Sequence, residues 1–139
     1  MTGHTTFTRD GWAAFKADDR PGPIHMLNLV RLRDAAEYDD GRVATGAEAY
    51  AEYGRLSAPV LERLGGQIVW RASMELMLIG PQDKMWDLCF IAEYPEPGAF
   101  ISMQRDPAYQ KAVIHRQAGV LDSRLIRTKP LPSGDGFAG

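Results

Sequence analysis

The chain has little of what several common classes of protein need. One cysteine, Cys89, in 139 residues rules out a disulfide within the chain. The net charge of −2 leaves no basic excess with which to bind nucleic acid. No apolar run approaches the roughly 20 residues that span a bilayer, and residues 1–9 lack the apolar segment of a signal peptide. We therefore expect a cytoplasmic protein that binds neither nucleic acid nor membranes.

Motifs for metals and cofactors are missing as well. The three histidines, His4, His25 and His115, are widely separated, and no close-spaced zinc ligand set occurs. We expect His4 to lie in an unstructured terminus. There is no glycine-rich phosphate loop and no G-x-S-x-G motif. The sequence predicts no metal and no cofactor, with a haem held by His115 left as an alternative.

What the chain does have is the composition of one globular domain. Apolar residues make up 45% and charged residues 24% of it, which suits a single domain of this length. We divide residues 1–139 into an N-terminal helical extension over 1–23, a core over 24–128 and a flexible tail over 129–139. The tail is rich in Pro, Gly and Ser, which is typical of disorder.

Two nearly continuous apolar runs dominate the core. Residues 24–32 and 86–94 have little alternation, which predicts strands buried on both faces in the middle of a sheet. Cys89 lies in the second run and is expected to be a small buried hydrophobe. Residues 67–72 alternate, with Ile68 and Trp70 on one face, and 74–79 extend this strand. A last strand is predicted over 121–127.

Helix signals separate these strands. Thr8 precedes a short helix, and Thr45 with Glu48 forms a capping box before a long apolar periodicity. Two further helices begin at Pro97 and at Asp106-Pro107. The order is βαββαβ, which predicts an α+β, ferredoxin-like fold with an antiparallel sheet. Helices cover one face of such a sheet, so the other, apolar face needs a partner, and a second copy of this chain is the simplest one.

Several short motifs together resemble one known family. They are Tyr50-x-x-Tyr53, Pro59, Gly65-Gly66, Tyr94-Pro95, Asp106-Pro107-x-Tyr109 and Asp122-Ser123-Arg124-Leu125. Their order and spacing over residues 24–128 resemble the family called domain of unknown function 1330. That family is similar to the dimeric α+β barrels, in which two ferredoxin-like sheets pack face to face. The resemblance implies a homodimer, and relatives in that superfamily include cofactor-free monooxygenases, isomerases and haem enzymes. This chain differs from shorter members by its N-terminal helix and a longer loop after the first strand.

Three polar residues fall in runs that should be buried, and they are the candidate catalytic residues: His25, Asn28 and Asp87. A buried polar group without a partner costs about 1–3 kcal/mol, so each must be paired or used. Because the two apolar strands are expected to be neighbours, Asp87 is predicted near a polar side chain of the first strand, where an Asp–His pair would serve as an acid/base device. A structural hydrogen bond is the alternative.

A second set of residues is predicted to bind a substrate. Arg116 and His115, late in the last helix, suit an anionic group, or else they complement the helix dipole. The aromatic candidates for lining a cavity, which are otherwise core residues, are Tyr50, Tyr53, Trp70 and Trp86.

The function stays open between three hypotheses. The first is a small cofactor-independent enzyme, like a monooxygenase or an isomerase, that acts on an aromatic or carboxylated metabolite. The second is a non-catalytic dimeric module that binds small molecules or other proteins. The third is a haem or metal protein. An open pocket between sheet and helices favours the first hypothesis, whereas a closed, well-packed interior favours the module.

Overall fold

The computed structural model describes residues 3–139, in which four strands form one antiparallel sheet. The strands are β1 (Ile24–Leu32), β2 (Gln67–Ala72), β3 (Leu88–Tyr94) and β4 (Val120–Thr128). Their order across the sheet is β2-β3-β1-β4, so the first and third strands lie in the middle. The two runs that lack alternation are therefore the two central strands, as the sequence predicts.

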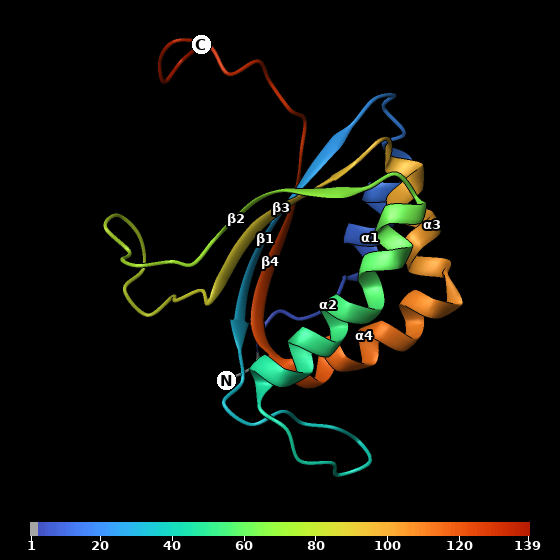
Figure 1. Cartoon of the computed structure of the whole chain (residues 1–139). Coiled ribbons are helices and arrows are strands. Elements are labelled where there is room, and N and C mark those ends of the chain that lie inside the picture. Colours follow the sequence, from blue (N-terminus) through green and yellow to red (C-terminus); the bar gives the residue numbers. More distant parts are fainter. Residues whose placement is uncertain (1–2) are drawn as a thin grey trace.

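The helices are α1 (Arg9–Ala17), α2 (Gly46–Arg63), α3 (Pro97–Arg105) and α4 (Pro107–Gly119). Figure 1 shows them on one side of the sheet, with α2 and α4 side by side. Without α1, and with α3 and α4 as one helical connection, the order is βαββαβ. The chain thus has the predicted α+β, ferredoxin-like fold.

The predicted helix caps are present. Thr8 accepts a hydrogen bond from Gly11 N at 2.9 Å, and Asp106 accepts from Ala108 N at 2.9 Å. Thr45 and Glu48 exchange both bonds of a capping box, at 2.8 and 3.0 Å. Each satisfies backbone donors that a helix start leaves free, so the local sequence fixes where the helices begin.

Two strand boundaries differ from the predictions. Residues 74–79 do not continue β2, because the strand ends at Ala72 and the chain projects from the sheet as a long loop before β3 (Figure 1). β3 begins at Leu88, so Trp86 and Asp87 precede it. Residues 129–139 contain no helix or strand and extend away from the sheet (Figure 1).

Register assigns each side chain of the central strands to one face. Met26, Asn28 and Val30 of β1 lie opposite Ala92, Phe90 and Leu88 of β3, and they share the face toward the helices. The core on this face is formed mainly by Ile24, Met26, Val60, Ala92, Tyr94, Phe100, Met103 and Tyr109. Its residues come from β1, β3 and the three helices α2, α3 and α4, so the core holds both layers together.

Candidate active site between sheet and helices

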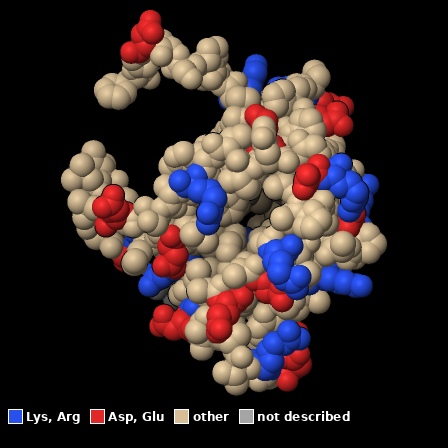
Figure 2. All heavy atoms as spheres, in the orientation of Figure 1, with Lys and Arg blue, Asp and Glu red and all other residues tan. Residues whose placement is uncertain are grey.

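A cavity of about 1120 Å³ separates part of the sheet from the helices. The surface is hollowed where the sheet and helices part, with basic side chains close to the hollow (Figure 2). The floor is formed by β1 and its neighbours, including Met26, Asn28, Phe90 and Leu125. These residues share a face, because Asn28 lies opposite Phe90 on β3 and Leu125 on β4. Asn28 is thus an amide among apolar side chains, and the sheet also contributes Arg71, Ser123 and Arg127 to the lining.

One side of α2 forms the facing wall. Tyr50, Gly54, Ser57 and Leu61 recur at helical spacing and all line the cavity. A Cβ on Gly54 would meet no atom within 4 Å, so the wall is recessed at this position. A side chain added at Gly54 would therefore have open space around it.

Tyrosines of α2 and α4 meet at the inner end of this wall. The Tyr53 and Tyr109 hydroxyls are 2.8 Å apart and hydrogen-bonded. Burial raises the pKa of Tyr53 well above its ordinary range, and burial raises the pKa of Tyr50 to about 12. Both phenols are therefore protonated at neutral pH, and each has a hydroxyl hydrogen that can be donated.

The N-terminal segment closes one side of the cavity. Thr5, Thr6 and Phe7 line it, followed by Trp12 and Phe15 of α1. The rings of Phe7 and Trp12 stack with centroids 5.3 Å apart, and Phe15 packs 4.9 Å from Phe100. Spacing predicts the helix that carries Trp12 and Phe15, but nothing in the sequence indicates that it docks over the sheet.

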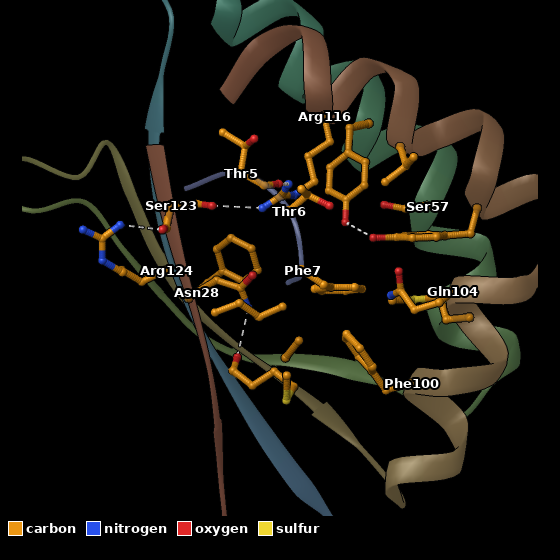
Figure 3. A pocket seen from close by; sticks show the side chains of 18 of the residues that line it. Thr5, Thr6, Phe7, Asn28, Ser57, Phe100, Gln104, Arg116, Ser123 and Arg124 are labelled. Carbon is orange, nitrogen blue, oxygen red and sulfur yellow. Dashed lines mark hydrogen bonds between the residues drawn. The ribbon is translucent and has the colours of Figure 1, made fainter. Parts of the chain in front are cut away.

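Backbone bonds hold this segment against β4. His4 N donates to Asp122 Oδ1 at 2.9 Å, and Ser123 Oγ donates to His4 O at 2.7 Å. Arg116 Nη1 donates to Thr5 O at 2.7 Å. Figure 3 shows Arg116 reaching from α4 toward Ser123, with Thr5 and Thr6 beside it. The expectation that His4 lies in an unstructured terminus is therefore wrong, because its backbone is paired on both sides.

Of the three catalytic candidates, only Asn28 lines the cavity. Its Nδ2 donates to Met26 O at 3.0 Å (Figure 3). His25 lies on the opposite face of the sheet, where its Nε2 is 2.7 Å from Glu93 Oε2. Asp87 lies beyond the other end of the strand pair, and its Oδ2 accepts from Leu32 N at 2.7 Å. The predicted pairing of Asp87 with a polar side chain of the first strand is therefore wrong.

Some of the predicted binding residues line the cavity and others do not. Tyr50, Tyr53 and Arg116 are among the residues that line the cavity. Trp70 lies outside the cavity on the far face of the sheet, opposite Ile91. Trp86 is buried beneath the guanidinium of Arg124, 5.2 Å from its ring centroid. His115 Nδ1 is 2.6 Å from the Tyr38 hydroxyl and lies outside the cavity lining.

Sequence comparison places the chain in a known group. A family model described as domain of unknown function DUF1330 matches residues 43–127. The chain belongs to this family. The match includes Tyr50, Tyr53 and Arg116 but begins after β1 and the N-terminal segment. The family model therefore covers only part of the cavity wall. A comparison with curated proteins found no match.

Solved structures extend the likeness over the whole chain. The methylated RPA0582 protein is 65% identical, with a TM-score of 0.94 and coverage of 97% of this chain and 100% of that one. A second crystal structure of RPA0582, described as a protein of unknown function from Rhodopseudomonas palustris, is 64% identical, with a TM-score of 0.91 and coverage of 94% and 99%. Both structures therefore cover more of this chain than residues 43–127, which the family model matches.

A distant structure supports the fold alone. SnoaB from Streptomyces nogalater, described as a cofactor-independent oxygenase, is 16% identical, with a TM-score of 0.53 and coverage of 81% and 96%. A protein of unknown function from Bacteroides fragilis, described as dimeric and ferredoxin-like, is 10% identical, with a TM-score of 0.50 and coverage of 78% and 96%. Both agree with the ferredoxin-like topology found for this DUF1330 member.

Within residues 3–139, no three His, Cys, Asp or Glu side chains are grouped so as to hold a metal ion. No helix in the same range is long and apolar enough to cross a membrane. The polar side chains that line the cavity carry amide, hydroxyl and guanidinium groups, together with the Asp18 carboxylate and the His4 imidazole.

Proposed function

We propose that this chain binds a small, largely apolar molecule, aromatic or carboxylated, in the cavity between its sheet and its helices. The observation that carries the proposal is the cavity itself, about 1120 Å³ in a chain of 139 residues. Ligand sites in proteins are typically concave, about 300–1,000 Å³ in volume, and apolar with a few placed polar groups. A closed, well-packed interior, which the interaction-module hypothesis requires, is not what the sheet and helices form.

The side chains that line the cavity suit such a ligand in their chemistry, and the cavity suits it in its volume. Aromatic rings from the N-terminal segment, α1, α2, β3 and α3 line the cavity, among them Phe7, Trp12, Tyr50, Phe90 and Phe100. Rings of this kind bind planar apolar molecules through stacked and edge-to-face contacts. Polar side chains, among them Asn28 and Arg71, interrupt this apolar lining, which favours one orientation of a bound ligand.

Thermal unfolding with a library of aromatic acids tests this proposal. A ligand present at a hundred times its dissociation constant is expected to stabilise the chain by about 2.7 kcal/mol. The Gly54→Phe variant is expected to abolish the shift, because the new ring extends from the recess of α2 into the cavity. Gly54→Ala is the matched control and keeps the shift, since its methyl group occupies little of the space.

Two outcomes would contradict the proposal. Either no acid in the library raises the melting temperature, or the best one raises it equally in wild type and in Gly54→Phe. The second outcome would place the ligand outside the cavity.

An enzyme that works without a bound cofactor, like a monooxygenase or an isomerase, is the second candidate. The observation that favours it is Asn28, whose amide lines the cavity and whose Nδ2 gives one hydrogen to Met26 O, which leaves a second hydrogen for a ligand. An amide there suits polarisation of a ligand carbonyl. The description of SnoaB as a cofactor-independent oxygenase is in keeping with this candidate. Recovery of every bound acid unchanged after incubation in air would contradict it.

We also propose that two copies of the chain pair through the sheet face that the helices leave open. Trp70 and Ile126 lie on that face and are 47% and 46% exposed. Leu27, Leu29, Cys89 and Ile91 share it by register. A contiguous apolar surface of this kind is rare on monomers. A second copy is the occupant we favour, because the ferredoxin-like protein from Bacteroides fragilis is described as dimeric.

A further inference from the structure

Four arginines line the cavity, and three of them are engaged by the protein. Arg116 donates to Thr5 O at 2.7 Å and to Ser123 Oγ at 3.3 Å. Arg124 donates to Asp122 Oδ1 and to Ser123 O, both at 2.8 Å. Arg127 donates to Phe15 O at 3.3 Å, and its Nη2 is 3.7 Å from the carboxylate of Asp18. These three guanidinium groups hold β4, α1 and the N-terminal segment together.

Arg71 differs from the other three. Among residues 3–139 it makes no side-chain hydrogen bond and no ion pair. It lies on β2 opposite Phe90, which puts its side chain on the helix-facing side of the sheet. β2 is an edge strand, so Arg71 stands at the rim of the cavity. Its charge is thus available to a ligand that enters there.

Tyr50 of α2 is a second polar group without a partner in the described chain. Its side chain is largely buried, and its hydroxyl makes no hydrogen bond with residues 3–139. Burial raises the pKa of this phenol, and the positive charges of Arg116 and Arg71 oppose the rise. Both guanidinium groups line the same cavity as Tyr50, whose hydroxyl stays protonated at neutral pH.

Within residues 3–139, no carboxylate forms an ion pair with Arg71. Asp18 is the one acidic residue among those that line the cavity, and Arg127 faces it. A guanidinium with planar, paired donors binds a carboxylate through two parallel, charge-assisted hydrogen bonds. A phenol hydroxyl adds a further donor to the same oxygen atoms.

We propose that Arg71 and the Tyr50 hydroxyl bind the carboxylate of the ligand, whose apolar body lies deeper, against the aromatic walls. The inference rests on the proposed function and narrows it to a class: planar or elongated apolar molecules with one carboxylate. It also moves the anion site from Arg116, the residue that the sequence indicates, to Arg71 on the edge strand. Arg116 is a positioning residue that holds the N-terminal segment in place.

Calorimetric titration with two probes of the same shape tests this inference. 2-Naphthoate carries the carboxylate, and 2-naphthamide is its neutral counterpart. Hydrogen bonds to charged groups contribute about 1.5–3 kcal/mol, so wild type is expected to bind the acid about 10- to 100-fold more tightly than the amide. Arg71→Gln is expected to remove that preference and to leave the affinity for the amide unchanged. Arg71→Lys is expected to restore part of it.

The controls separate this inference from the proposed function. Arg55→Gln removes an exposed arginine of α2 outside the cavity lining, and it is expected to leave both affinities unchanged. Two outcomes overturn the Arg71 site while ligand binding in the cavity stands. In the first, wild type binds the acid and the amide equally. In the second, the preference for the acid is lost in Arg116→Gln or Arg127→Gln but kept in Arg71→Gln. If neither probe binds wild type, the inference and the proposed function both fail.

Discussion

The Gly46→Ala variant is expected to lose about 3 kcal/mol of its free energy of unfolding, although it adds only one methyl group. A Cβ at this position would overlap Arg33 O and lie 2.8 Å from Arg33 N and from its carbonyl carbon. These atoms belong to the backbone, so no rotamer change relieves the overlap. Overpacking costs about 1–3 kcal/mol even where neighbours can shift, and whole domains are stable by about 5–15 kcal/mol.

The local structure explains why this close approach exists. Gly46 opens α2, and its N donates to Asp34 O at 3.4 Å just after the end of β1. Arg33 N in turn donates to Gly119 O at 2.8 Å, at the end of α4. A strand and two helices therefore meet backbone to backbone at one point. The glycine sets where α2, and with it Tyr50, sits over the cavity.

Urea unfolding followed by circular dichroism measures this effect. Gly54→Ala, the same substitution eight residues further along α2, is the matched control. Its Cβ meets nothing within 4 Å, so the gain in helix propensity is expected to stabilise the chain by about 0.5–1 kcal/mol. A Gly46→Ala variant as stable as wild type, within about 1 kcal/mol, would show that α2 is not in contact with Arg33.

The second large effect is expected at the open face of the sheet. Leu27 lies at the centre of that face, opposite Ile91 on one side and Ile126 on the other. In the proposed dimer, Leu27→Glu buries a carboxylate from each copy without a partner, which costs about 3–5 kcal/mol for each unpaired charge. The dissociation constant is therefore expected to rise more than about 100-fold.

Sedimentation velocity distinguishes the dimer from the monomer directly. Wild type is expected to sediment as a dimer at micromolar concentration and Leu27→Glu as a folded monomer. Ile114→Glu introduces the same carboxylate at a position of α4 that is 57% exposed, and it is expected to remain dimeric. A monomeric wild type, or a Leu27→Glu variant that dimerises as wild type does, would rule out pairing through this face.

The sequence predicted the sheet order because both faces of each central strand carry mostly apolar side chains. Helices pack on the face that carries Met26, and the other face carries Leu27 and Leu29, so neither alternate set of β1 is free to be polar. The caps at Thr8, Thr45 and Asp106 were also predictable, because each depends on residues within three positions. Helix caps and central strands can therefore both be predicted from a single sequence.

The candidate site was harder to predict, because register is not local. The neighbouring strands were foreseen, but antiparallel pairing sets His25 opposite Glu93 and leaves Asp87 at the far end. The register of β2 also shifts between Ile68 and Trp70. Such a bulge changes which side chains share a face, so Ile68 and Arg71 line the cavity while Trp70 points away. Strict alternation predicted Ile68 and Trp70 together.

No sequence pattern indicates that the N-terminal segment forms one side of the cavity. It is held by the backbone of His4 and Thr5, whose partners, Asp122, Ser123 and Arg116, lie more than a hundred residues away. Backbone donors and acceptors exist at every residue, so sequence alone does not mark the ones that are used.

A crystal structure grown with 2-naphthoate tests the central claim most directly, since it shows at once where a ligand lies and which side chains touch it. The account predicts the naphthalene ring between α2 and the sheet, close to Phe90, with the carboxylate beside Arg71 and Tyr50. A ring bound elsewhere, with the space between sheet and helices left empty at saturating ligand, would contradict it.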